Sequence, residues 1–113
     1  MKRLRKQDAA ELPVSHDPDQ RKRVLLAKGV VKPFLQISEF TLLPGKQITP
    51  HSHRDAVETF YLLEGSATFV VNGVSHQVSV GDVIVLEPGD QHHLESHSES
   101  PARMFCLLVL AED

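Results

Sequence analysis

Short apolar runs separated by turn residues dominate the chain from about residue 23 onward. Apolar and polar positions alternate over residues 34–43, a period that is typical of a strand with one buried face. Turn signals then recur every eight to ten residues, and helical periodicity is absent. This rhythm predicts an all-β, antiparallel sandwich or barrel of about nine strands with little or no helix.

Glycine, proline and asparagine residues mark where the expected strands end. Asn72-Gly73 is the strongest hairpin signal, because a type I′ turn requires positive φ at both central positions. We predict strands over residues 24–31, 34–43, 46–53, 57–63, 66–71, 73–80, 83–87, 92–96 and 103–110.

The first 20 residues are polar, contain Pro13 and Pro18 and show no clear periodicity, so we expect an irregular lead-in. We divide the chain into a polar arm over residues 1–22 and a single barrel domain over residues 23–113. A chain of 113 residues has room for one domain with a modest core.

The overall charge argues against nucleic acid as the main partner. Lys and Arg number 12 and Asp and Glu 15, a net charge of -3. Two local basic clusters are interpreted as solvated charge rather than as a nucleic-acid or membrane contact. These clusters are Lys2, Arg3, Arg5 and Lys6, and Arg21, Lys22 and Arg23.

Hydropathy and cysteine content predict a cytoplasmic protein with no membrane partner. No apolar stretch approaches the roughly 20 residues that span a bilayer, and no signal-peptide segment follows the basic N-terminus. Cys106, the single cysteine, cannot form an internal disulfide, which agrees with a reducing compartment. Because Cys106 lies in an apolar run, we expect a buried, inert thiol.

Candidate chemistry is concentrated between Gly45 and Gly65. His51 and His53 are two residues apart, so on a strand both point the same way, within reach of one ion. Glu58 lies at an odd offset and can join them only if the chain turns around residues 54–57. Imidazoles with one carboxylate suit iron, manganese, nickel, copper or zinc rather than calcium.

The segment from Gly81 to His92 contributes a fourth candidate ligand. Gly81 and Gly89 allow sharp turns, and His92 begins the strand that follows. His93 is a poor ligand, since strand alternation sends it to the opposite face.

With these two segments in place, the chain resembles the cupins, a family of small β-barrels marked by two motifs. The first motif is matched at every fixed position, by Gly45, His51, His53, Glu58 and Gly65. The resemblance covers roughly residues 34–110 and implies a double-stranded β-helix, or jelly roll.

The second cupin motif is matched in part. Gly81, Gly89 and His92 are in place, whereas Glu87 stands where the family has proline and Ser96 where it has asparagine. Neither departure touches a ligand, although the turn near Pro88 is expected to differ in shape.

The resemblance implies that His51, His53, Glu58 and His92 bind one divalent metal ion and leave one or two positions open. The alternative is an unmetallated set of polar groups lining a wet pocket, satisfied by one another or by water. Strand parity suggests the residues that share the pocket. These are Gln36, Phe40, Gln47, Phe60, Leu94 and Ser96.

Two functions follow from the resemblance, because this fold alone does not fix function. The first is a metal-dependent enzyme acting on a small organic molecule, either a dioxygenase or a catalyst of other carbonyl or enol chemistry, including isomerases, lyases and decarboxylases, with Glu58 as ligand and base. The alternative is a non-catalytic cupin that binds or senses a small molecule. Residues 59–65 and 104–110 are apolar on both faces, which favours a homodimer.

Overall fold

A computed structural model of the chain describes residues 1–14 and 17–111. Within these residues nine strands form two antiparallel sheets, which confirms the all-β prediction, and one 3-10 turn, η1 Lys6–Asp8, is the sole helical element. No described helix is long and apolar enough to cross a membrane. The strands are β1 Glu11–Val14, β2 Asp17–Leu26, β3 Phe34–Leu42, β4 Ala56–Glu64, β5 Ser66–Val71, β6 Val74–Ser79, β7 Val83–Leu86, β8 His92–Glu95 and β9 Ala102–Leu110.

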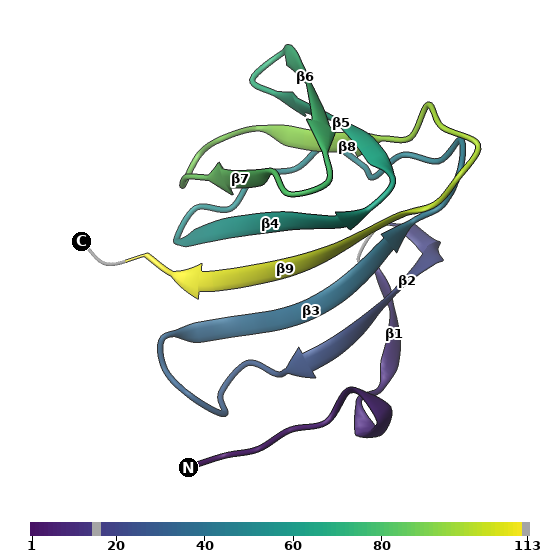
Figure 1. The fold of residues 1–113 in the computed structure, drawn as a ribbon. Coiled ribbons are helices and arrows are strands. Elements are labelled where there is room, and N and C mark those ends of the chain that lie inside the picture. The colour runs from purple at the N-terminus through teal and green to yellow at the C-terminus, as the bar shows by residue number, and fades with distance from the viewer. Residues whose placement is uncertain (15–16, 112–113) are drawn as a thin grey trace.

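The larger sheet has the strand order β1-β2-β3-β9-β4-β7, and the smaller has the order β6-β5-β8 (Figure 1). The two are not closed into one continuous barrel. Asn72 and Gly73, with φ of 49° and 82°, connect β5 to β6. This confirms the predicted hairpin, because both residues adopt the left-handed conformation that the turn requires.

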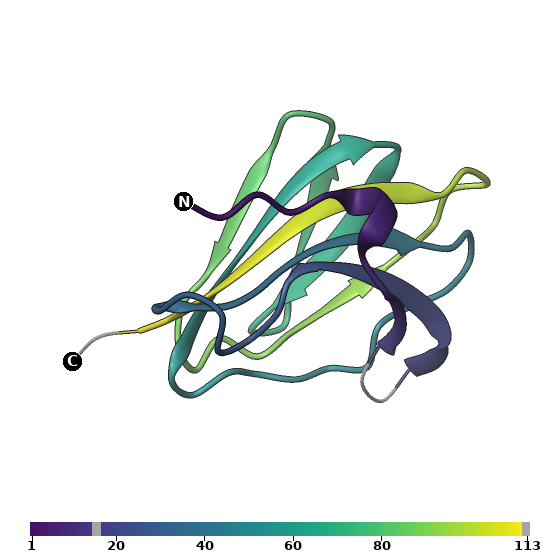
Figure 2. The ribbon, with the colours of Figure 1, turned by 90° about the horizontal axis from the view of Figure 1, so that it is seen from below.

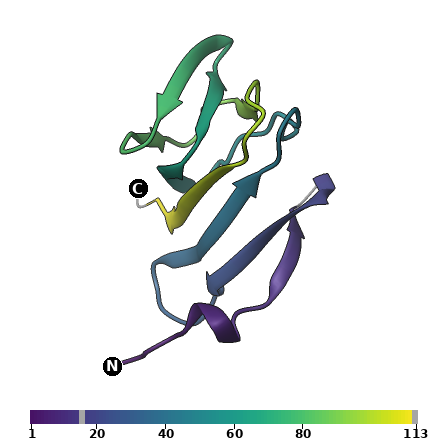
Figure 3. The ribbon, with the colours of Figure 1, turned by 45° about the vertical axis from the view of Figure 1, so that its right-hand side comes forward.

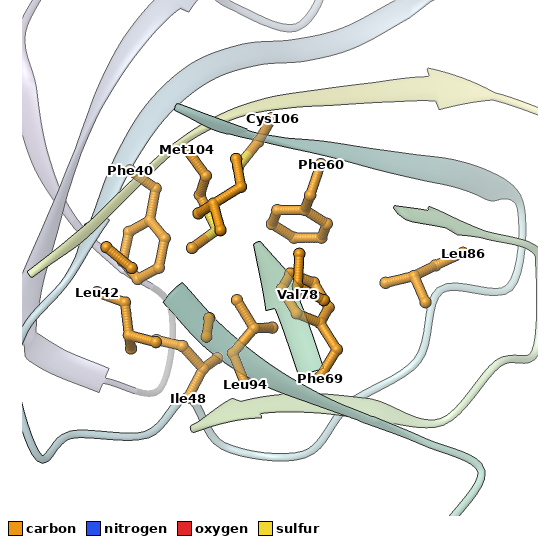
Figure 4. Close-up of a cluster of buried hydrophobic side chains, with 13 residues drawn as sticks. Phe40, Leu42, Ile48, Phe60, Phe69, Val78, Leu86, Leu94, Met104 and Cys106 are labelled. Atoms are coloured by element: carbon orange, nitrogen blue, oxygen red, sulfur yellow. The ribbon is translucent and has the colours of Figure 1, made fainter. Parts of the chain in front are cut away.

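The core fills the space between the sheets. Leu62, Met104 and Phe40 lie opposite one another on β4, β9 and β3, so their side chains share the inner face of the larger sheet. Phe60 meets Phe69 of the smaller sheet edge to face, with ring centroids 5.2 Å apart (Figure 4). Burying a phenylalanine side chain contributes about 1.5–3 kcal/mol, so these contacts hold the sheets together.

The prediction of a strand over residues 46–53 is wrong. This segment makes only two isolated bridges, Gln47 with Glu95 and His51 with His92. Pro50 between them has no N–H to donate to a ladder. In Figure 2 the connection from β3 to β4 runs along the lower edge of the molecule before the chain turns into β4.

The irregular lead-in predicted for residues 1–20 is wrong over residues 11–14 and 17–20, which form strands, and residues 15–16 lie outside the described ranges. β1 and β2 extend the larger sheet beyond β3 (Figure 3). Gln20 of β2 is 1% exposed; its Nε2 donates to Gln47 O at 3.0 Å and its Oε1 accepts from Leu43 N at 3.4 Å. The hydrophobic pattern did not predict this polar strand, because the side chain that it buries here is an amide, whose polar atoms are satisfied by hydrogen bonds.

The expected boundary between residues 22 and 23 falls inside β2. The division into an arm and a barrel domain remains a prediction. The last two residues of the predicted domain, 112–113, lie outside the described ranges. The strand predicted over residues 24–31 ends earlier, at Leu26. Cys106 is buried, as expected, and burial raises the pKa of its thiol well above the usual value, which disfavours the reactive thiolate.

Candidate metal centre

Three separate parts of the chain bring four candidate ligands together. His51 and His53 lie on the segment before β4, Glu58 lies on β4, and His92 begins β8. One potential ligand atom from each residue lies within 4.8 Å of the other three. The chain bends at Arg54-Asp55 before β4 begins, as the odd offset of Glu58 required.

Backbone carbonyls orient two of the imidazoles. His51 Nδ1 lies 2.9 Å from Thr49 O, and His92 Nδ1 lies 2.9 Å from Asp90 O. Donation from each Nδ1–H to its carbonyl leaves Nε2 unprotonated and available to a metal ion. Burial lowers the pKa of His51, which favours the neutral imidazole that metals bind.

Glu58 lies between two of the histidines. Its Oε1 is 3.3 Å from both His53 Nε2 and His92 Nε2, but neither contact has hydrogen-bond geometry. All three atoms are buried and lack a partner among the described residues. Burial by itself would raise the pKa of Glu58, but the two imidazoles lower it to about 2, so the carboxylate is ionised at neutral pH. Burial likewise opposes the charged form of His92, yet Glu58 raises the pKa of this histidine.

These atoms fit one transition-metal ion. Ligands about 2.1 Å from an ion lie roughly 3–4 Å from one another. The four candidate atoms all lie within 4.8 Å of one another, so small side-chain shifts would bring them onto one ion. Buried polar atoms without partners are rare in folded proteins. The nitrogen-rich donor set suits a first-row transition metal.

A cavity of about 380 Å³ is lined by three of the four residues, His51, His53 and Glu58, whereas His92 is buried and is not part of the lining. This volume lies in the range of small-molecule sites. Of the predicted pocket residues, Gln36, Phe40, Phe60 and Leu94 line the cavity, together with Cys106.

The remaining two predicted pocket residues do not line it. Gln47 is exposed while Ile48 is buried and faces the cavity, because parity counted back from His51 fails across the irregular segment. Ser96 is buried beyond the end of β8, away from the cavity lining, and its hydroxyl has no described partner.

Sequence reasoning missed Lys22, which also lines the cavity. Its place in a basic cluster suggested solvated charge, whereas β2 turns it inward. The sequence held no independent signal for it: Lys22 shares a face with the buried Gln20, but the burial of Gln20 is itself a result of the tertiary structure.

Residues 38–108 match the sequence profile of the family described as Cupin domain, which is more than half of the chain. The chain belongs to the cupin family. Among curated proteins, this cupin is 28% identical over 69 residues to an oxalate-binding protein of Thermotoga maritima, an alignment that covers 61% of this chain and 57% of the relative. It is 36% identical over 95 residues to the dimethylsulfoniopropionate lyase DddW of Ruegeria pomeroyi, covering 76% and 59% respectively.

The cupin chain spans about three fifths of the length of these curated relatives. Among solved structures, one of a Thermotoga maritima protein described as a predicted oxalate decarboxylase has a TM-score of 0.83 and 21% identity. That match covers 96% of this chain and 99% of the solved one. At this identity the likeness establishes the fold alone.

Proposed function

We propose that this cupin holds one divalent transition-metal ion at His51, His53, Glu58 and His92 and acts on a small organic molecule in the adjoining cavity. The observation that supports it is the convergence of four ligand atoms within 4.8 Å of one another, three of them from residues that line a 380 Å³ cavity. The bound ion, one of iron, manganese, nickel, copper or zinc, would supply oxygen activation or polarisation of a carbonyl or enol.

Residues of the chain itself provide a candidate base and an apolar lining. The ionised Glu58 carboxylate would serve as a ligand, and it is also the one carboxylate among the described residues that line the cavity, so it is the candidate base. Phe40, Ile48 and Phe60 give this cavity an apolar lining for the carbon skeleton of a bound molecule.

Metal analysis tests the proposal directly. Protein purified without chelators or added metal should contain about one equivalent of a transition metal per chain by elemental analysis. His51→Ala and His92→Ala should lose the metal, since each removes a ligand. His76→Ala is the control, because His76 is exposed on β6 and far outside the cluster. Full metal occupancy in His51→Ala would refute the assignment.

The leading candidate activity is that of a dioxygenase. It is tested by measuring oxygen uptake with a panel of diketones, catechols and oxalate. Uptake that His92→Ala abolishes would support it. Turnover of the same compounds without oxygen would instead support the carbonyl or enol version.

A second candidate is a non-catalytic cupin that binds or senses a small molecule. The relative named an oxalate-binding protein favours it. A tightly bound metal, together with ligand binding but no turnover with or without oxygen, would support this function over the enzyme.

We also propose that the cupin forms a homodimer through the outer face of β4 and β7. Tyr61, Val83 and Val85 are 41%, 56% and 55% exposed. Tyr61 lies opposite Val83 on the neighbouring strand, so the two side chains share this face. An apolar sheet face of this kind is typical of a subunit contact. The cytoplasmic location stays a prediction from the hydropathy and the single cysteine of the sequence.

A further inference from the structure

Apart from the histidines, the described cavity lining contains one carboxylate, on Glu58, and one amine, on Lys22. Glu58 is one of the proposed metal ligands. Lys22 is therefore the charge left to face a bound molecule. With a divalent ion bound at the four-residue cluster, the ion, one carboxylate and one ammonium would together carry a net positive charge.

The fold directs Lys22 into the cavity. Lys22 lies opposite Phe40 on the neighbouring strand, and Phe40 belongs to the buried face of the sheet. Its Nζ donates to Gln36 Oε1 at 2.9 Å. Lys22 also borders a charged hollow on the other face of the sheet, but Gln36 lines the cavity and not that hollow. The bond to Gln36 therefore places the ammonium on the cavity side.

The ammonium keeps hydrogen-bonding capacity for a ligand. A lysine has three donors, and one is used by Gln36. Within residues 1–14 and 17–111 no carboxylate forms a salt bridge with Lys22. A half-buried charge without a counter-ion is costly, so an anion bound here would be stabilised.

The strand register places the partner of Lys22, Gln36, in line with Glu58 across the larger sheet. Gln36 lies opposite Leu108 on β9, and Leu108 lies opposite Glu58 on β4. Gln36 and Glu58 are thus in one row, two inter-strand spacings or roughly 10 Å apart at the backbone. Their side chains line the same cavity, so one bound molecule can face both ends.

We propose that Lys22, oriented by Gln36, determines specificity for small organic acids. The carboxylate of the ligand binds Lys22 Nζ, and a second oxygen-bearing group faces the four-residue cluster. The apolar residues Phe40, Phe60 and Leu108 enclose the short carbon skeleton between them. The second contact rests on the proposed metal function, whereas the contact with Lys22 does not.

The test compares Lys22→Met with Lys28→Met. Lys28 is an exposed lysine in the loop after β2, so its loss removes the same charge away from the cavity. Oxalate and malonate are titrated calorimetrically into each protein, with the neutral amides oxamide and malonamide as uncharged probes. Lys22→Met should bind the carboxylates at least about tenfold more weakly, because a charge-assisted hydrogen bond is lost. Lys28→Met should match the wild type.

Two results overturn the proposal. One is equal carboxylate affinity in the wild type and Lys22→Met, and the other is a wild type that binds the acids no better than the amides. Should Lys22→Met lose its native circular dichroism spectrum, Lys22→Arg and Lys22→Gln decide the same question. The arginine variant should keep the preference for acids, and the glutamine variant should lose it.

Elemental analysis of the same samples separates this proposal from the metal function. Full metal content with carboxylate binding that does not depend on Lys22 would refute the specificity role alone. If the wild type contains no metal as purified without chelators, and still binds the acids more tightly than Lys22→Met does, the metal function alone is refuted.

Discussion

His51 and His92 exchange two backbone hydrogen bonds. His51 N–H donates to His92 O at 2.9 Å, and His92 N–H donates to His51 O at 2.8 Å. This isolated antiparallel bridge places the imidazole centroids 4.3 Å apart. Since β8 belongs to the smaller sheet and Glu58 to the larger, the four ligands meet only when both sheets are in place. Folding and metal binding should therefore be coupled.

Metal removal should lower the stability of the protein. An ion that binds only the folded state adds about 2.7 kcal/mol at a hundred times its dissociation constant. Complete chelation should therefore lower the melting temperature measured by circular dichroism. His92→Ala is the control and should respond little to chelator, while an unchanged melting temperature in the wild type would contradict the coupling.

Asp17→Ala should weaken metal binding without touching a ligand. Asp17 Oδ2 accepts from Thr49 N at 3.0 Å and Oδ1 accepts from Thr49 Oγ1 at 2.9 Å. Thr49 O in turn accepts from the His51 imidazole. Loss of such an outer contact lowers metal affinity by about tenfold, measured by competition with a chromogenic chelator.

Asp19→Ala is the matched control for that measurement, because Asp19 lies on the same strand and pairs with Lys46 at the exposed surface. Its metal affinity should equal that of the wild type. An equal affinity in Asp17→Ala would show that Asp17 does not position His51.

Gly65→Ala should destabilise the fold more than an ordinary glycine replacement. Gly65 has φ of +79°, and an added Cβ would lie 2.5 Å from Pro101 O and 3.0 Å from Ala102 Cα. Gly29 also has positive φ, but an added Cβ there meets nothing within 4 Å. The backbone cost of about 1–2 kcal/mol is common to both variants. Gly65→Ala should lose about 1–3 kcal/mol more in urea unfolding, and equal losses would exclude the clash.

Glu39→Gln should lower stability at neutral pH but not in acid. Glu39 Oε1 lies 2.8 Å from Lys6 Nζ and 3.3 Å from Arg103 Nη1. The hydrogen bond from Lys6, with the charges of both cations, holds the pKa of Glu39 below its ordinary value of 4.5. The ionised carboxylate therefore stabilises the folded state above pH 4.5, and this stability is lost as the pH falls through the lowered pKa.

The loss at neutral pH should be about 1 kcal/mol or less, as for other surface ion pairs. Urea unfolding from neutral pH down to about pH 3 should show the difference from the wild type shrinking toward zero. Glu99→Gln, at an exposed loop position, should show no such difference. A difference that grew in acid would reverse the assigned sign.

Val83→Lys should disrupt the proposed homodimer. It places a charge on the outer apolar face beside Tyr61, where a subunit contact would bury it without a partner. Light scattering at micromolar concentration should give a dimer mass for the wild type and a monomer mass for this variant. Val74→Lys, at a 57% exposed position on the smaller sheet, should stay dimeric. A monomeric wild type would contradict the proposal.

The strand rhythm and the candidate ligands were predictable from local signals. Asn72-Gly73 marks its hairpin by backbone conformation, and the odd offset of Glu58 from the histidines required a bend that the structure contains. Spacing within a few residues carries this information, because strand alternation and turn geometry are properties of the chain itself.

The amino-acid sequence by itself thus determined the fold class, the family and the four candidate ligands. Tertiary structure decided which other side chains face the cavity. Residues 46–53 contain Pro50 and make only isolated bridges, so the strand alternation that predicted Gln47 in the pocket does not hold there. The pairing of β2 with β3 directs Lys22 into the cavity. Alternation predicts a face only within a continuous strand, and which face of a polar strand is buried depends on the partner beside it.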